Sequence, residues 1–102
     1  MGTYVLLSTL TDEGRETVSE RPERIKEVNH ELEAMGIKVL HQYAVLGPYD
    51  FVSIVEAQDN DSVFRMSLAL GSRGTVQIMS LAAIPVDDFI ASIRGYSRQS
   101  LH

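Results

Sequence analysis

The apolar positions of the chain follow two periods, one typical of strands and one typical of helices. Short runs rich in β-branched and aliphatic side chains predict strands, and they lie at residues 3–10, 37–46, 51–57 and 75–84. Apolar residues that recur at helical spacing predict helices, and they lie within residues 12–35, 59–70 and 86–93. The predicted order is therefore β-α-β-β-α-β-α.

Capping residues and glycines mark where the predicted helices begin and end. Thr11 and Asp12 supply capping oxygens, and Pro22, whose missing N–H is harmless in a first turn, marks a second start. The first helix is therefore expected to be broken. Glycine tolerates the left-handed conformation that ends many helices, and the expected ends are Gly36, Gly71 and Gly95, with a polar tail after the last.

This order, with a right-handed crossover, predicts an α+β fold. It is a ferredoxin-like βαββαβ unit with a four-stranded antiparallel sheet and an additional C-terminal helix. The strands are apolar on both faces. In the first strand Val5 and Leu7 alternate with Tyr4, Leu6 and Leu10. In the second, the predicted faces are Ile37, Val39, Tyr43 and Val45 on one side and Leu40, Ala44 and Leu46 on the other.

The helices of this topology cover only one face of the sheet. A strand that is apolar on both faces needs cover on both. We therefore expect a homodimer, or a higher even oligomer, in which two sheets pack face to face. The helix predicted within residues 59–70 is apolar around most of its circumference, so it too is expected to be buried on more than one side.

The composition fits one domain over residues 1–102 and narrows the partners. The chain has no cysteine and carries 14 acidic against 9 basic residues, a net charge of -5, which opposes binding to nucleic acid. No segment has the roughly 18 to 20 apolar residues of a membrane span, and no signal peptide is recognisable. We expect a cytoplasmic protein without a membrane or nucleic-acid partner.

Much of the negative charge lies in one predicted element. Residues 12–36 contain eight acidic and four basic side chains, so the long helix is expected to present a solvated outer face. Glu20 and Arg24 are spaced to pair across a helical turn. Glu23, Glu27 and Glu31 are spaced to repel one another.

Several short motifs occur in a characteristic order. They are TDEG at residues 11–14, PER at 22–24, LGPYD at 46–50 followed by VSIVEA, and LALGSRG at 68–74. In this order and spacing the chain resembles the GYD domain family of the dimeric α/β-barrel superfamily. The resemblance implies a ferredoxin-like subunit that dimerises through its sheet, and it implies no particular activity. The chain departs from the family at Arg21, where a small capping Ser is usual before Pro22, so this helix start is expected to fray.

The segment of residues 47–50 has two interpretations. In the first it is a turn, in which Pro48 keeps Gly47 extended and Asp50 accepts hydrogen bonds from nearby N–H groups. In the second the phenol of Tyr49 and the carboxylate of Asp50 orient a small polar ligand. On this second interpretation Gly47, Tyr49 and Asp50 are the predicted ligand-binding residues.

His41 and Tyr43 are two positions apart in a strand, so both are expected on one face. His41 is either a hydrogen-bonded filler or an acid–base group. The candidate catalytic residues are therefore His41, Tyr43, Tyr49 and Asp50. His30, His41 and His102 share no element, so no metal site is predicted, and no cofactor is expected.

Two further groups of residues invite a functional interpretation. The loop at 71–74 follows a helix C-terminus, which disfavours anions, so it is interpreted as a cap and turn. Ser8, Ser53 and Ser80 lie in strands and could face an internal cavity, although no nucleophile motif surrounds them.

Two functions remain open. The first is a non-catalytic oligomeric module that binds a small molecule or a protein partner, with a site between sheet and helices. The second is a cofactor-independent oxygenase or isomerase, with His41 or Asp50 as the base and Tyr43 or Tyr49 stabilising an oxyanion. A pocket on which His41 and a tyrosine hydroxyl converge favours the enzyme.

Overall fold

A computed structural model describes residues 1–100 of the chain, so His102 lies outside the described residues. The eight elements are β1 (Gly2–Leu10), α1 (Asp12–Glu20), α2 (Arg24–Ala34), β2 (Lys38–Ala44), β3 (Phe51–Ala57), α3 (Asn60–Gly71), β4 (Val76–Ala83) and α4 (Val86–Ser100). The predicted order is confirmed, and the long first helix is broken into α1 and α2.

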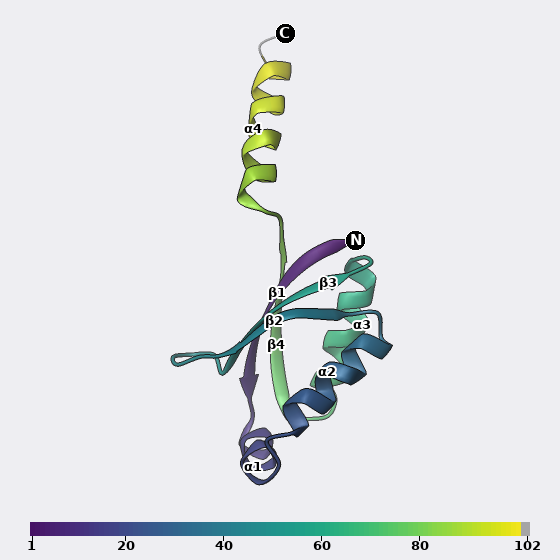
Figure 1. Cartoon of the computed structure of the whole chain (residues 1–102), viewed down its shortest axis with the longest axis vertical. Coiled ribbons are helices and arrows are strands. Elements are labelled where there is room, and N and C mark those ends of the chain that lie inside the picture. The colour runs from purple at the N-terminus through teal and green to yellow at the C-terminus, as the bar shows by residue number, and fades with distance from the viewer. Residues whose placement is uncertain (101–102) are drawn as a thin grey trace.

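The four strands form one antiparallel sheet in the order β2-β3-β1-β4 (Figure 1). This order and connectivity are those of a ferredoxin-like βαββαβ unit, so the predicted α+β class is confirmed. The register places Val5 of β1 opposite Ile54 of β3 and Leu81 of β4. These three residues therefore lie on the same face of the sheet, because facing residues share a face.

Helices α2 and α3 cover the other face (Figure 1). The core between them consists of apolar side chains that are at least nine-tenths buried: Tyr4, Leu6, Leu32, Ile37, Val55, Ala57, Val63, Met66 and Leu70. The period of two in β1 and β3 and the period of 3.6 in α3 direct these side chains into one layer. This core is thin, because a single layer of helices provides it.

No helix of the described chain lies over the face of the sheet opposite α2 and α3 (Figure 1), and the pairing of the strands places apolar side chains on this face. We call it the open face, and its apolar members are Val5, Leu7, Val52, Ile54, Met79 and Leu81. Met79 and Leu81 are 50% and 43% exposed. The prediction that the strands are apolar on both faces is confirmed for β1 and β4.

The faces predicted for β2 are wrong. The pairing with β3 is irregular between Val39 and His41, so Leu40 is an extra residue that shifts the alternation. Val39 faces Val55 in the core, whereas Tyr43 faces Val52 on the open face. A bulge is the physical reason, since one inserted residue moves every later side chain to the opposite face.

The start of α1 follows the predicted capping, and α3 begins with a cap of the same kind. The Thr11 hydroxyl accepts a hydrogen bond from the Gly14 N–H at 3.1 Å. The Asp59 carboxylate accepts one from the Ser62 N–H at 2.8 Å. At α2, the N-cap Glu23 makes no side-chain capping bond, in keeping with the expected weak start beside Arg21.

Gly14 allows a close approach between α1 and the start of β4. A Cβ atom at this position would lie 2.0 Å from the Thr75 carbonyl oxygen, far inside van der Waals contact. The Thr11 N–H donates to the same carbonyl at 3.0 Å. Gly14 therefore positions α1 against the edge of the sheet.

One of the predicted helix ends is wrong. Gly36 has a φ of +83° after α2, as predicted, and α3 ends at Gly71, as predicted, although the positive φ occurs three residues later, at Gly74. Gly95 lies inside α4, which continues to Ser100. An interior glycine costs a helix only about 1 kcal/mol relative to alanine, so it does not compel an end.

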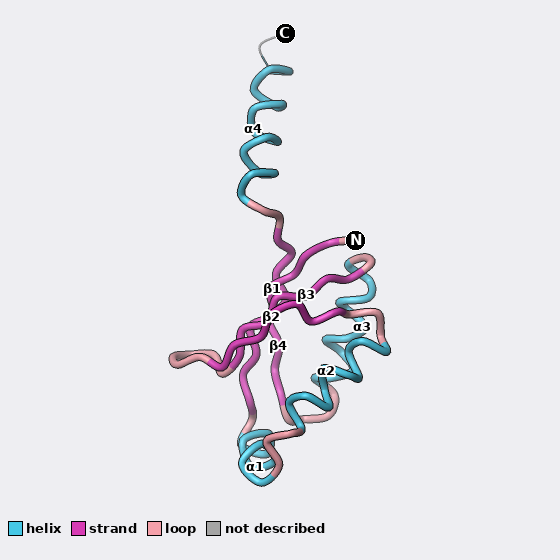
Figure 2. Tube along the Cα trace, viewed as in Figure 1, coloured by secondary structure: helices cyan, strands magenta, loops and turns pink. Residues whose placement is uncertain are grey.

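Helix α4 projects away from the sheet and the other helices (Figure 2). It extends the molecule to 61 × 29 × 20 Å. Its apolar side chains lie on one stripe and are 39–72% exposed: Val86, Phe89, Ile90, Ile93 and Tyr96. We call these residues the α4 stripe. No helix within residues 1–100 has the length and apolar character needed to cross a bilayer.

Candidate functional site

A cavity of about 270 Å³ lies between the covered face of the sheet and helices α1 and α2. Its wall is mainly aliphatic, with side chains such as Leu6, Val28 and Ile78. Ser8 and Ser53 also line it, and their small side chains leave space where a larger residue would fill the core. The prediction that these two serines face an internal cavity is confirmed.

Ser80, the third serine of that prediction, makes a different contact. Its hydroxyl lies 3.0 Å from the Ser67 hydroxyl of α3, and it does not line the cavity. This hydrogen bond ties β4 to α3. Ser80 therefore has a structural role in this chain.

Three polar side chains on the cavity wall form a hydrogen-bonded series. The Asn29 amide of α2 donates to the Gln42 side-chain oxygen at 2.8 Å. The Gln42 amide in turn donates to the Ser53 hydroxyl at 3.2 Å. Ser53 is only 4% exposed. Because its oxygen accepts from Gln42, its own proton is free to donate to another group.

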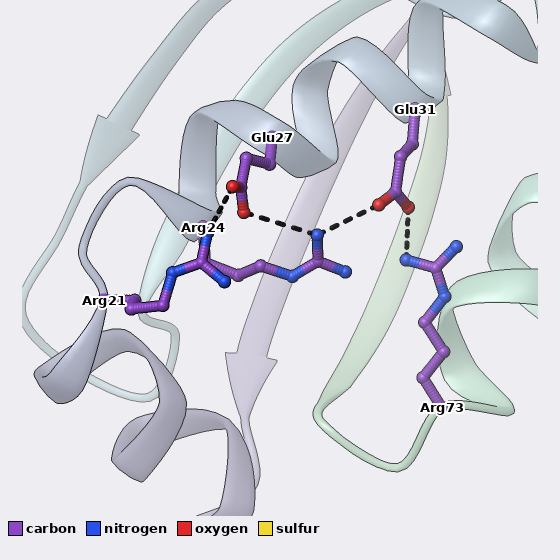
Figure 3. Close-up of polar contacts among 5 residues, drawn as sticks. All are labelled: Arg21, Arg24, Glu27, Glu31 and Arg73. Atoms are coloured by element: carbon purple, nitrogen blue, oxygen red, sulfur yellow. Dashed lines mark hydrogen bonds and ion pairs between the residues drawn. The ribbon is translucent and has the colours of Figure 1, made fainter.

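Arg24 and Arg73 line the cavity, and both belong to a row of alternating charges (Figure 3). Arg24 Nη1 lies 3.1 Å from Glu31 Oε1 and 3.5 Å from Glu27 Oε2. Arg21 pairs with Glu27, and Arg73, from the loop after α3, pairs with Glu31. We call these five residues the charge row. It links α2 to a loop about 40 residues away in the sequence.

The charge row fixes the ionisation of Glu31. The hydrogen bond from Arg73 is the largest of the effects that lower the pKa of the Glu31 carboxyl below its usual value. Desolvation opposes it, and the charge of Arg73, the hydrogen bond from Arg24 and the charge of Arg24 add to the lowering. Glu31 is therefore ionised at neutral pH. Its predicted repulsion with Glu27 is relieved because Arg24 lies between them.

The predicted pair between Glu20 and Arg24 is absent among the described residues, where Arg24 pairs with Glu27 and Glu31 instead. The break between α1 and α2 is the reason, since the two residues lie on different helices. The i,i+4 spacing brings side chains together only within one continuous helix.

His41 and Tyr43 lie on one face, as predicted, but on the open face. His41 faces Ile54 and Tyr43 faces Val52 across β2 and β3. Tyr43 is 59% exposed. Gln42, between them, is the β2 residue that reaches the cavity. The two aromatic candidates are therefore separated from the cavity of their own chain by the sheet.

The loop of residues 47–50 makes the contacts of a turn. Asp50 Oδ2 accepts from the Leu10 N–H at 2.8 Å, and the Asp50 N–H donates to the Ser8 carbonyl at 2.8 Å. The Tyr49 hydroxyl lies 3.8 Å from the Met79 sulfur. Neither Tyr49 nor Asp50 lines the cavity. Ligand binding by Gly47, Tyr49 and Asp50 stays a prediction.

The backbone of Gly47 differs from the expected extended form. Its φ is +116°, a region that is favourable only for glycine. Pro48 disfavours the right-handed helical region for the residue before it, and glycine can satisfy this restriction at positive φ. Gly47 is therefore a residue that the turn itself requires.

The chemistry of the cavity wall differs from the chemistry predicted for the site. Among the described residues that line the cavity there is no His, Tyr, Asp or Glu, and the charged groups there are Arg24 and Arg73. Among residues 1–100, no group of three or more His, Asp or Glu side chains is placed to hold a metal. The wall offers hydroxyl, amide and guanidinium groups, which donate hydrogen bonds that orient a bound molecule.

Sequence reasoning missed Asn29, Gln42 and Arg73 as members of the site. Of these three, Gln42 was the easiest to predict from the sequence, because an amide in the middle of an apolar strand needs a polar partner. Arg73 gave no such signal. Its pairing with Glu31 depends on tertiary structure, since the two residues lie far apart in the sequence.

Helix α3 also presents an apolar surface. Phe64 and Leu68 lie one turn apart and are 71% and 75% exposed. Val63, Met66 and Leu70 of the same helix are buried against the sheet. In a single chain α3 is therefore covered on one side only. We call Phe64 and Leu68 the α3 patch.

Comparisons with known proteins agree with this architecture. A protein of Thermus thermophilus named "Glutamine synthetase and cystathionine beta-lyase binding protein" is 59% identical over 95 residues, which span 92% of this chain and 100% of that protein. The crystal structure of TTHA0845 from Thermus thermophilus superposes with a TM-score of 0.52 at 22% identity, covering 83% of this chain and 95% of that one. The sequence model of the GYD domain matches residues 4–93. The chain belongs to the GYD domain family.

Proposed function

We propose that this protein is a homo-oligomeric interaction module whose partners are two enzymes, a glutamine synthetase and a cystathionine β-lyase. The observation that carries the proposal is the 59% identity with a Thermus protein named for binding these enzymes, over the whole length of that protein. The exposed apolar surfaces described above support the same conclusion, since patches of this kind mark interaction sites. A cytoplasmic location is part of this proposal.

A second copy of the chain covers the open face and the α4 stripe. An ordinary soluble monomer has a largest apolar patch of about 300–600 Å². In a single copy of this chain, both the open face and the five exposed side chains of α4 are left without cover. Helix α4 has 15 residues, and an isolated helix of about this length is marginal in water. A permanent partner that keeps α4 folded is therefore favoured over a transient one.

The α3 patch is the surface for the enzyme partners. Helix α3 is anchored to the sheet by Val63, Met66 and Leu70, so it stays folded whether or not a partner is bound. Phe64 and Leu68 lie on its other side. Two large apolar side chains at helical spacing are typical anchors for a groove on a partner.

Binding to the purified enzymes tests the proposal. Full-length protein is mixed with glutamine synthetase or cystathionine β-lyase from the organism that encodes it, and complex formation is followed by analytical ultracentrifugation. We expect a complex at micromolar concentrations. The double variant with Phe64→Ser and Leu68→Ser is expected to weaken it at least about tenfold, because it removes both anchors.

Glu33→Gln is the matched control, because Glu33 is exposed on α2 and outside all the surfaces named above. It is expected to leave complex formation unchanged. If neither enzyme forms a complex at tens of micromolar concentration, the proposed partners are wrong. If the complex forms and the α3 variant binds as the wild type does, the partners are right and the α3 patch is wrong.

A further inference from the structure

The cavity beneath α1 and α2 has the size of a site for a small molecule. Its volume is about 270 Å³, whereas an apolar cavity of about 150 Å³ already admits benzene. A molecule somewhat larger than benzene therefore fits. The wall is mainly aliphatic, with Leu6, Val28 and Ile78 among its members, so the body of that molecule is apolar.

The deep part of the cavity carries two hydroxyl groups. Ser53 receives a hydrogen bond from Gln42, so its proton is directed elsewhere. Ser8, in β1, lies on the same face of the sheet, two positions along the register from Leu6, which faces Ser53. The Ser8 hydroxyl makes no hydrogen bond to the described part of the chain. Both hydroxyl groups can therefore donate to a molecule bound in the cavity.

The mouth of the cavity favours a negative charge. An arginine side chain has five N–H donors. Arg24 uses only Nη1, which contacts both Glu27 and Glu31, and Arg73 uses only Nη1, which contacts Glu31. In the described part of the chain, the other guanidinium nitrogen atoms of Arg24 and Arg73 make no hydrogen bond or ion pair, so they can donate to a ligand. Both residues line the cavity.

The charge balance of the mouth sets the charge of the ligand. The charge row contains three arginines and two glutamates, so it carries one excess positive charge. Glu31 stays ionised because of its lowered pKa. A single carboxylate matches this excess, and a planar carboxylate suits the fork of donors that arginine presents.

From these observations we propose that the cavity binds a small organic monocarboxylate. Its carboxylate contacts the unused donors of Arg24 and Arg73, and its apolar tail occupies the space beside Ser8 and Ser53. The residues of the α3 patch, Phe64 and Leu68, do not line this cavity. It is therefore a second binding function, separate from the surface proposed for the enzyme partners.

Calorimetric titration of the full-length protein tests the site with defined probes. The probe is 4-methylpentanoate. The comparison molecules are 4-methylpentanamide, which has the same tail without the charge, acetate, which has the charge without the tail, and inorganic phosphate. We expect 4-methylpentanoate to bind at least about tenfold more tightly than each of them, because charged hydrogen bonds and tail burial contribute together.

Two variants identify the site. Arg73→Gln is expected to weaken 4-methylpentanoate binding at least about tenfold and to leave amide binding unchanged. Val28→Phe fills the cavity and is expected to abolish binding of both. Arg65→Gln is the matched control, since Arg65 contacts Ser62 on α3 and does not line the cavity. Circular dichroism confirms that each variant is folded.

Three results would overturn the proposal. One is the absence of 4-methylpentanoate binding up to about 10 mM, which is weaker than any site of this kind requires. Another is equal affinity for the acid and the amide. The third is wild-type affinity in folded Arg73→Gln and Val28→Phe proteins. None of these results depends on whether the chain binds the proposed enzymes.

Discussion

The two faces of the sheet carry similar side chains in different surroundings. On the covered face, Leu6 and Val55 are 3% and 0% exposed beneath α2 and α3. On the open face, Met79 and Leu81 are 50% and 43% exposed. The side chains of the strands are apolar on both faces. The difference in exposure therefore comes from the helices of a single chain, which cover only one of the two faces.

This comparison separates folding from association. The covered face holds the core that defines the fold, and it also holds the cavity with its polar wall. The open face contributes little to the core of one chain and is the surface that we propose a second copy covers. Substitutions on the two faces should therefore fail in different ways.

The largest expected effect is on the covered face. Met66 is 0% exposed, so Met66→Ala leaves a cavity and is expected to lower the free energy of unfolding by about 2–5 kcal/mol. Phe64→Ala, two residues earlier and 71% exposed, is expected to change it by less than about 0.5 kcal/mol. Urea unfolding of both variants measures the difference. Equal destabilisation would contradict the placement of α3.

The next effect is on association through the open face. Leu81→Glu places a carboxylate where a second copy is expected to pack, and burying an unpaired charge is strongly unfavourable. We expect the dimer dissociation constant to rise at least about a hundredfold. Sedimentation velocity at several concentrations measures this. The circular dichroism spectrum should stay close to that of the wild type, apart from the contribution of α4.

A substitution in the α4 stripe tests whether α4 also belongs to the interface between copies, because this stripe is exposed in a single chain. Ile93 is 48% exposed, and Ile93→Ser removes one apolar member of the stripe. If a second copy covers the helix, we expect a dissociation constant about tenfold higher, since burying one aliphatic side chain contributes about 1.5–3 kcal/mol. Unchanged dimer affinity would show that α4 lies outside the interface.

The smallest effect concerns pH. The pKa of Glu31 is lowered in the folded chain by Arg73 and Arg24, so its ion pairs stabilise the fold above the ordinary value of 4.5. That contribution is lost as the pH falls through the lowered pKa. Because the pairs are partly exposed, Glu31→Gln should cost less than about 1 kcal/mol at pH 7.

Urea unfolding of the wild type and Glu31→Gln between pH 7 and pH 3 measures this contribution. The difference between the two proteins should be largest at neutral pH and should shrink in acid. A difference that grows as the pH falls would contradict the charge row.

The parts of the fold that depend on local residues were predictable. Thr11 begins α1, a second helix follows Pro22, and the alternation in β1 and β4 assigns both faces. The faces of β2 were not predictable, because Leu40 adds one residue without interrupting the apolar run. The extent of α4 was missed because Gly95 weakens a helix without ending it.

The site was predicted less well than the fold. Ser8 and Ser53 were correctly expected to face a cavity, since their strands and faces followed from alternation. The partners of Gln42 and Glu31 come from other elements. A single sequence contains no local signal for such contacts. His41 and Tyr43 share a face as predicted, but alternation alone could not show which face the helices cover.

Native mass spectrometry of the freshly purified full-length protein tests the central claim most directly. If a second copy covers the open face, the main species at low micromolar concentration contains two, or a higher even number of, 11.3 kDa chains, and Leu81→Glu shifts it to single chains. A wild-type protein that remains a stable 11.3 kDa monomer under these conditions would contradict the account.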